Sequence, residues 1–358
     1  MLAFIQERKD DFDPRLFVNE LADASKNLGV LEAKISAYQF NSILVPMLNR
    51  KEAISSMNIE GTQTTTMSDV LHEDVNPSKT NEKISIEVHN HIRTLAFGST
   101  YLNTDKFSHS FIQELHKRML DKIIKEELKN TLGKYKTKDN CIKNSSGRVI
   151  FTPPSHKATR KYMDELISYM NDTFDGVNPL IKAAIIHSQF ESIHPFSDGN
   201  GRVGRLLVSL YLYKAQVINF PFFYISEAIG EDKSVYYNML TDSRTNDLSK
   251  WIKYFLSKIA IQAKKHIGYI DSLNALYGQT KKVVEQCIKS TKNELLIDYL
   301  FTHPVLNADL LYEGLGISRG QALRYLDVLE KEHVLLGDDR KRGRTFFFEQ
   351  LIVLANGF

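Results

Sequence analysis

Residues 194–205 bring together several groups that can act on phosphates. The segment has the sequence HPFSDGNGRVGR, with His194 four residues before Asp198. A histidine titrates near neutral pH and can take a proton from a hydroxyl, and an aspartate is a typical oxygen ligand for Mg²⁺. These residue types predict proton transfer beside a metal-bound phosphate.

The turn that follows predicts an anion site. Gly199, Asn200 and Gly201 let backbone N–H groups converge on an anion, and a helix that begins after them adds its positive dipole end. Arg202 and Arg205 are three residues apart on that helix and can hold phosphate oxygens with multi-donor side chains. Taken alone, the tetrapeptide Asp-Gly-Asn-Gly indicates only a surface turn.

Two helices must position this segment. Asn178 as cap and Pro179 at the first position predict a helix that runs to about Ile193. A second helix is expected from Arg202 to about Ala215. His187 lies seven residues before His194 on the same helix face, and we expect it to be a packed or hydrogen-bonded support.

A carboxylate stands in an unfavourable place earlier in the chain. Residues 50–61, RKEAISSMNIEG, predict a helix that Gly61 ends, so Glu60 is its last residue. There the carboxylate meets the negative end of the helix dipole, at a cost of about 0.3–1 kcal/mol unless a cation compensates. An exposed, solvated Glu60 and a functional Glu60 both remain open from this segment alone.

The 194–205 segment resembles the signature of the Fic family, H-x-F-x-(D/E)-G-N-G-R-x-x-R, at all of its fixed positions. The resemblance implies that His194 is a general base, that Asp198 binds Mg²⁺, that Gly199, Asn200 and Gly201 form an anion hole, and that Arg202 and Arg205 hold nucleotide phosphates. The implied reaction is attack of a Ser, Thr or Tyr hydroxyl of a protein target on the α-phosphate of ATP. Phe196 is expected to be buried and to fix the loop.

Ser56 to Gly61 is similar to the inhibitory motif of the same family, (S/T)-x-x-x-E-(G/N). That likeness implies that Glu60, with Ser56, pairs with Arg205 and blocks the seat of the γ-phosphate of ATP. The enzyme would then be autoinhibited. Some relatives use this glutamate to remove AMP, so transfer and removal both stay open.

Other parts of the likeness are less specific. Residues 133–141 and 147–154 resemble the hairpin flap that holds the target beside the active site, although a plain surface hairpin fits the same residue types. Tyr236 and Tyr237 match a position where relatives enclose adenine, whereas a tyrosine pair in a helix also fits a core. The likeness covers about residues 48–256.

Apolar residues at three- and four-residue spacing predict a mainly α protein. The expected fold is a Fic-type helical bundle with a small β-hairpin flap. We expect an N-terminal helical region at 1–85, a catalytic core at 86–262, a helical linker at 263–290 and a further domain at 291–358.

The C-terminal segment, 291–358, resembles a winged helix. Helices are expected at 292–301, 307–313 and 318–332, with a hairpin at 338–348. Arg340, Lys341, Arg342 and Arg344 on the wing would suit DNA. However, this segment has eight Lys or Arg against ten Asp or Glu. The charge favours a protein contact or support of a homodimer over DNA binding.

Composition excludes some classes of protein. The 358 residues include 46 Lys or Arg and 43 Asp or Glu, a net charge of +3 that does not indicate nucleic acid or membrane as the main partner. No stretch is apolar enough to span a bilayer, and the two cysteines match no metal or redox spacing. We therefore expect a cytoplasmic protein.

Three functions remain open at this point. The first is a protein adenylyltransferase that uses ATP and Mg²⁺. The second is a DNA-binding regulator whose Fic core acts as a sensor, and the third is a Fic enzyme that removes AMP or transfers phosphate, UMP or phosphocholine. The complete set from Asp198 to Arg205 favours AMP.

Overall fold

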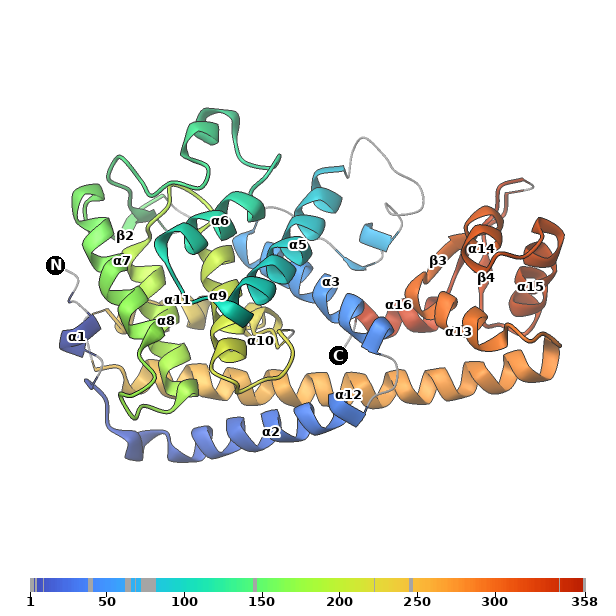
Figure 1. Ribbon diagram of the computed structural model, residues 1–358, viewed down its shortest axis with the longest axis horizontal. Coiled ribbons are helices and arrows are strands. Elements are labelled where there is room, and N and C mark those ends of the chain that lie inside the picture. Colours follow the sequence, from blue (N-terminus) through green and yellow to red (C-terminus); the bar gives the residue numbers. More distant parts are fainter. Residues whose placement is uncertain are drawn as a thin grey trace. The chain divides into compact units, whose positions relative to one another are not determined.

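The computed structural model describes residues 3, 5–8, 10–37, 41–61, 66–67, 69–71, 82–143, 147–221, 223–244, 247–340 and 342–356. The chain divides into two compact units, and several long helices contribute residues to both. Figure 1 shows the elements and their labels.

The first unit consists of Met1–Glu32, Ser55–Gln63 and Ile86–Lys264. Its α-helices, some of which also enter the second unit, are α1 (Ile5–Arg8), α2 (Val18–Ala37), α3 (Asn41–Glu60), α5 (Glu82–Thr104), α6 (His109–Met119), α7 (His156–Asn171), α8 (Pro179–Ile193), α9 (Asn200–Lys214), α10 (Ser226–Gly230), α11 (Lys233–Asp242) and α12 (Ser249–Cys287). Short 3₁₀ helices lie at Pro14–Leu16 and Glu126–Thr131.

The centre of this unit is the antiparallel pair of α8 and α9, with α7 beside α8 and α6 beside α9 (Figure 1). Every residue from Leu180 to Ile193 is buried. This helix lies inside the core on all of its faces, and its buried polar side chains therefore need partners within the protein. As predicted, the Asn178 side chain caps α8 by accepting the Leu180 N–H, and Pro179 is its first residue.

The expected hairpin is present. Strand β1 (Ile142–Lys143) pairs antiparallel with β2 (Val149–Phe151). The side chains of Val149 and Ile150 are exposed.

The second unit consists of Ala33–Ile54, Thr64–Ser85 and Lys265–Phe358. It contains α13 (Asn293–Thr302), β3 (Val305–Asn307), α14 (Ala308–Leu315), α15 (Arg319–Lys331), β4 (Leu336–Gly337), β5 (Thr345–Phe347) and α16 (Glu349–Asn356). The strands form one antiparallel sheet in the order β3-β5-β4. The three helices and the hairpin lie where the sequence places them, whereas β3 was not expected. The winged-helix interpretation remains a prediction.

The mainly helical fold with a small hairpin is confirmed, and three details differ from expectation. Helix α9 begins at Asn200 rather than Arg202, because Gly199 caps it with a left-handed backbone. Helix α3 continues upstream through Pro46. The stretch expected as a core helix followed by a linker is one uninterrupted helix of 39 residues, α12. In the part of the chain described, no helix has the length and apolar character needed to cross a bilayer.

Candidate active site

His194 is the first residue after α8, and its backbone is strained. It adopts the left-handed conformation, with φ 47° and ψ 61°, while its N–H still donates to the Phe190 carbonyl. This conformation costs a residue with a side chain roughly 1–2 kcal/mol, so the surroundings must hold it. Its ring Nδ1 is buried and has no hydrogen-bond partner among the described residues. Strain and an unpaired nitrogen together favour a functional role.

The charge state of His194 follows from its surroundings. Burial, helped by the charges of Lys136 and Arg244, lowers its pKa to about 4, although the Glu191 carbonyl and Glu60 act in the opposite direction. The imidazole is therefore neutral at pH 7. A neutral imidazole can accept a proton, as a general base must.

The loop from His194 to Gly199, called here the 194–199 loop, is fixed by its neighbours. The Asn200 side chain accepts the Phe196 N–H (2.8 Å) and donates to the Phe196 carbonyl (2.9 Å). The Phe196 ring is fully buried and stacks on His116 with centroids 3.9 Å apart. Asn200 thus uses its side chain on the loop, which leaves only its backbone N–H for a ligand. The buried, structural position expected for Phe196 is the one observed.

The turn at Gly199 brings the start of α9 close to α6. Gly199 has φ 74°, and a Cβ there would lie 2.7 Å from Leu120 Cδ1. Only glycine fits both conditions. The N–H groups of the first turn of α9, which begins at Asn200, have no acceptor within the helix and carry its positive dipole end. The arrangement can hold an anion.

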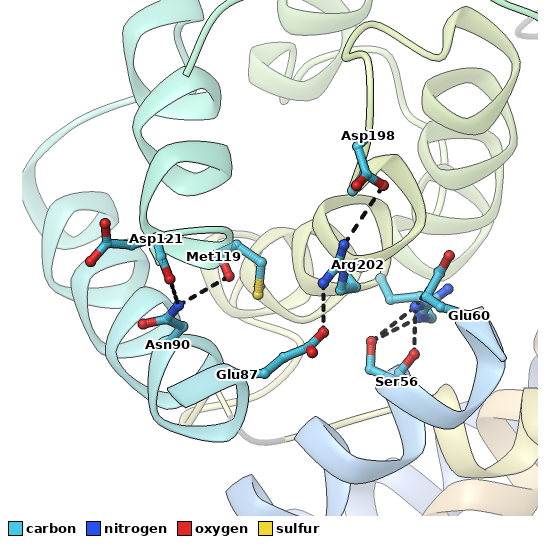
Figure 2. Close-up of polar contacts among 10 residues, drawn as sticks. Ser56, Glu60, Glu87, Asn90, Met119, Asp121, Asp198 and Arg202 are labelled. Atoms are coloured by element: carbon cyan, nitrogen blue, oxygen red, sulfur yellow. Dashed lines mark hydrogen bonds and ion pairs between the residues drawn. The ribbon is translucent and has the colours of Figure 1, made fainter. Parts of the chain in front are cut away.

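Arg202 lies between two carboxylates, as Figure 2 shows. Its NH1 donates to Glu87 Oε1 of α5 at 2.5 Å, and its NH2 is 3.8 Å from Asp198 Oδ1. Its buried Nε has no hydrogen-bond partner among the described residues. Glu87 was not identified from the sequence, because it lies 115 residues away from Arg202 on a helix with no motif.

Arg205 is bound by the last turn of α3. Its Nε and NH2 donate to the Ser56 hydroxyl (3.1 and 3.0 Å), and NH2 also donates to the Ser56 carbonyl (2.9 Å) and to Glu60 Oε1 (2.8 Å). Figure 2 shows Ser56 and Glu60 on the same side of this helix. The side chain of Arg205 is 1% exposed and that of Glu60 is 32% exposed. Helix α3 therefore supplies oxygen atoms that accept hydrogen bonds from the buried guanidinium of Arg205.

The two charges stabilise each other. Burial alone would raise the pKa of Glu60, but Arg205 outweighs it and the pKa of the carboxyl is lowered. Burial alone would lower the pKa of Arg205, and Glu60 reverses this as well. Both groups are ionised at neutral pH. If α3 moves away, Arg205 needs another anion, because an unpaired buried charge is costly.

Glu191 is a second carboxyl near this arginine. It lies on α8, is buried, and its Oε1 has no hydrogen-bond partner in the described ranges. Burial raises its pKa to about 7, against the effect of Arg205. In the sequence, Glu191 is marked only by its place as a charged residue in a largely apolar helical run that ends at Ile193. Such a residue is retained in a core only with a partner or a task.

A small residue at 204 is required by Glu191. A Cβ on Gly204 of α9 would overlap Glu191 Oε1 and lie 3.1 Å from Phe190 Cδ1. We expect Gly204→Ala to lower the free energy of unfolding by about 1–3 kcal/mol, the usual cost of overpacking. Denaturant unfolding followed by circular dichroism measures it.

The matched control is Gly29→Ala in α2, where a Cβ would meet no atom within 4 Å. It should be neutral or stabilising, because alanine favours helices over glycine by about 1 kcal/mol. Equal effects of the two substitutions would contradict the crowding at Gly204.

The two tyrosines expected near adenine differ in their exposure to solvent. Tyr236 is 1% exposed and its hydroxyl is 2.9 Å from His187 Nε2, whereas Tyr237 is 38% exposed. Burial lowers the pKa of His187 to about 3, so that it is neutral. His187 is a packed, hydrogen-bonded support, as expected. Only Tyr237 of the pair has substantial surface open to a ligand.

The residues present suit a magnesium ion that arrives with a nucleotide. Asp198 is the one carboxylate of the motif; its Oδ1 accepts the Gly199 N–H (2.7 Å), and the side chain is 39% exposed. Among the residues described, no three His, Cys, Asp or Glu side chains are grouped as ligands for a metal ion. Mg²⁺ commonly takes one or two carboxylates and completes its shell with phosphate oxygens and water. The observed donor set fits that pattern.

Taken together, the site can bind a polyphosphate and deprotonate a hydroxyl. The start of α9, Arg202 and Arg205 supply donors for phosphate oxygens, and His194 supplies a neutral imidazole. The predicted site residues from His194 to Arg205, together with Ser56 and Glu60, lie in one place, within the first unit.

Comparison with known proteins points to one family. A model of the Fic/DOC family matches residues 106–212, and a model of the Fic/DOC family N-terminal region matches residues 18–100. Together the two ranges cover just over half of the chain.

Curated relatives are similar over about half of the chain. Protein adenylyltransferase fic-1 of Caenorhabditis elegans is 27% identical over 192 residues, which are 51% of this chain and 35% of the relative. Protein adenylyltransferase Fic of Drosophila willistoni is 26% identical over 176 residues, 48% of this chain and 32% of the relative. The chain thus spans about a third of the length of these relatives.

Solved structures share the fold. A Fic family protein from Desulfovibrio desulfuricans matches with a TM-score of 0.57 and 19% identity, over 92% of this chain and 95% of that one. A Fic domain containing signaling protein from Bacteroides thetaiotaomicron matches with a TM-score of 0.55 and 24% identity, over 68% of this chain and 97% of that one. These likenesses concern the fold alone.

Proposed function

The chain belongs to the Fic/DOC family, and from this premise we propose that it is a protein adenylyltransferase, which moves AMP from ATP to a Ser, Thr or Tyr hydroxyl of a target protein. The observation that carries the proposal is the neutral His194 beside the anion site at the start of α9. The names of the curated relatives support AMP as the transferred group.

Each residue has one task in the proposed reaction. The N–H groups at the start of α9, with Arg202 and Arg205, hold the phosphates of ATP. His194 takes the proton of the target hydroxyl as its oxygen attacks the α-phosphorus. The bond from that phosphorus to the bridging oxygen breaks, and pyrophosphate leaves. Asp198 would hold a Mg²⁺ ion that arrives with ATP, and the ion would supply positive charge to the phosphates.

We propose that Glu60 holds the enzyme in an inhibited state. Its carboxylate and Ser56 occupy the donors of Arg205 that a terminal phosphate needs. A phosphate and Glu60 then compete for one guanidinium. Such a pair suits a switch better than it suits stability.

The position of the label in ATP shows which group is transferred to the target. Glu60→Gly protein is incubated with a target mixture and with ATP labelled at either the α- or the γ-phosphate. AMP transfer predicts protein label from the α position only, whereas phosphate transfer predicts it from the γ position only. Labelled UTP and CDP-choline test the two other transfers. Mass spectrometry of the labelled proteins identifies the target and the modified residue type.

The pH dependence of transfer follows from the lowered pKa of His194. Above that pKa, near 4, the base is already neutral, so activity is lost only as pH falls through it. Between pH 7.5 and 5.5 the rate should change less than about twofold, whereas an ordinary histidine of pKa about 6.5 would lose about tenfold.

The control for this pH profile is a variant in which Glu191, a second group that titrates in this pH range, is replaced. Glu191, with a pKa of about 7, titrates in the same range, so Glu60→Gly is compared with Glu60→Gly/Glu191→Gln. Loss of Glu60 lowers the pKa of His194 further and leaves the expectation unchanged. A tenfold decline that persists in the double variant would refute it.

A DNA-binding regulator is the second candidate, and charge pairing in the C-terminal segment weakens it. Arg344 bonds twice to Glu330 of α15 (2.6 and 2.9 Å), and Arg340 bonds to Asp338 (2.6 Å). Arg319 pairs with Asp309 at 2.9 Å. Cations neutralised inside the domain have less charge to offer phosphates. We propose a protein contact or dimer support for residues 291–358.

Removal of AMP by the same site stays an alternative activity. We also propose that the protein acts in the cytoplasm, where its two free, exposed cysteines would stay reduced. For the organisation of the chain we keep the proposal of an N-terminal region at 1–85, a core at 86–262, a linker at 263–290 and a domain at 291–358.

A further inference from the structure

The segment just before the hairpin holds the backbone of the 194–199 loop. The ammonium of Lys136 donates to the Ile193 carbonyl (3.2 Å), and the Lys136 N–H donates to the Pro195 carbonyl (2.8 Å). The Asn140 amide donates to the carbonyls of His194 and Phe196, both at 3.2 Å. Four consecutive carbonyl groups around His194 are therefore bound from one short segment.

The two side chains act as a pair. The Lys136 ammonium also donates to Asn140 Oδ1 at 2.8 Å, which orients the amide so that its NH₂ faces the loop. His116 adds a further contact at the far end, with Nε2 3.1 Å from the Asp198 carbonyl. Carbonyl groups of the loop are thus bound both before and after Phe196 in the chain.

Lys136 is costly where it stands. It is 3% exposed, and its two bonds go to an amide oxygen and a carbonyl oxygen, neither of which is charged. The charge of Asp139 raises the pKa of Lys136 and so offsets part of the cost of burial, but burial has the larger effect. An apolar residue would therefore pack there at lower cost. Burial lowers its pKa to about 8, and it remains mostly protonated at pH 7. The cost suggests a function for the charge and the bonds.

We infer that Lys136 and Asn140 are positioning residues for the general base. They keep the strained backbone of His194 in place and connect it to the foot of the hairpin, since Asn140 lies two residues before β1. A target held by the hairpin would then be aligned with His194 by the same segment. Only the expected effect on kcat rests on the proposed function, whereas the effect on the pKa of His194 does not.

The ammonium also acts on His194 through its charge. The charged groups around the imidazole are Lys136 and Arg244, which lower its pKa, and Glu60, which raises it together with the Glu191 carbonyl. After burial, Lys136 is the largest of these influences. Loss of its charge should therefore raise the pKa of His194, an effect that a purely structural residue would not have.

The first test needs no activity. Protein with ¹³C-labelled histidine is titrated by NMR from pH 8 to well below the pKa of His194, and His194→Gln assigns the His194 signal. We expect Lys136→Met to raise the pKa of His194 by at least about half a unit. Lys138→Met is the matched control, because Lys138 is an exposed lysine of the same segment, and its loss should leave that pKa unchanged. Equal pKa values in the two variants would overturn the inference.

The second test uses Asn140→Asp in the Glu60→Gly background. The aspartate keeps an acceptor for Lys136 but loses both donors to the loop. We expect kcat to fall about 10-fold or more, with the KM for ATP within about twofold. Calorimetric titration with ATP should give an unchanged stoichiometry, which excludes an unfolded fraction. An unchanged kcat would overturn the inference.

The two failures are distinguishable. If the Glu60→Gly parent does not transfer AMP, the proposed function fails, and the NMR titration still decides the role of Lys136. If the parent is active and the variants behave like Lys138→Met, only the positioning role fails.

Discussion

We expect Glu60→Gly to raise the rate of AMP transfer about 10- to 100-fold over the unsubstituted protein. Arg205 then loses the carboxylate at 2.8 Å and is free to bind a terminal phosphate. A hydrogen bond to a charged group contributes about 1.5–3 kcal/mol. Its loss would change the ratio of the inhibited to the uninhibited state by roughly 10- to 100-fold. Initial rates of α-labelled ATP incorporation, with Mg²⁺ and a fixed target mixture, measure it.

Two further substitutions separate the carboxylate from the helix. Glu60→Ala removes the same group but favours the helical end of α3 by about 1 kcal/mol more than glycine does. It should activate equally if the carboxylate inhibits. Glu60→Gln keeps the size and loses the charge, so that it should activate partly. Activation by glycine alone would indicate that a loosened helix, and not the loss of the Arg205 pair, is responsible.

Equal labelling by Glu60→Gly and the unsubstituted protein would show that the pair with Arg205 does not inhibit. The affinity for ATP gives an independent check. Because Glu60 and the nucleotide compete for Arg205, calorimetry should show tighter binding of ATP·Mg²⁺ to Glu60→Gly.

His194→Ala in the Glu60→Gly background should lower AMP transfer by about 10²- to 10⁴-fold, the usual contribution of a positioned general base. The imidazole is the neutral acceptor in the site, since its pKa is lowered to about 4. ATP binding should persist, because the donors for the phosphates lie on α9. The expected result is therefore a loss of kcat with the KM for ATP nearly unchanged.

The control is His303→Ala, which removes an exposed imidazole in the second unit, where its Nδ1 is 2.9 Å from the Thr302 hydroxyl. It should retain the parent rate. Transfer by His194→Ala at the parent rate would exclude His194 as the base. A loss of ATP binding in this variant would instead assign His194 a part in holding the nucleotide.

Some features of this protein could be predicted from residue types and short spacings. The cap at Asn178 and the glycine at 61 that follows the last residue of α3 depend on neighbours within a few residues. Periodic apolar positions likewise predicted a mainly helical fold. The segment 194–205 indicated phosphate chemistry because its groups are adjacent in the chain.

Contacts between distant residues could not be predicted from the residue types. Glu87 reaches Arg202 across 115 residues, and Lys136 binds the Ile193 carbonyl across 57. Neither side chain belongs to a periodic pattern or a turn, so only packing brings them together. The short strand β3 was missed for a related reason, since its pairing with β5 lies about 40 residues along the chain.

The sequence by itself determined which groups the site contains: a histidine, an aspartate, a glycine-rich turn and two arginines, together with a carboxylate at the end of a helix. The tertiary structure decided the state of these groups. Burial makes His194 neutral, and its Nδ1 has no hydrogen-bond partner among the residues that the structure describes. The approach of α3 to α9 joins Glu60 to Arg205. Charge state and pairing depend on desolvation and on distances between segments, and these exist only once the chain has folded.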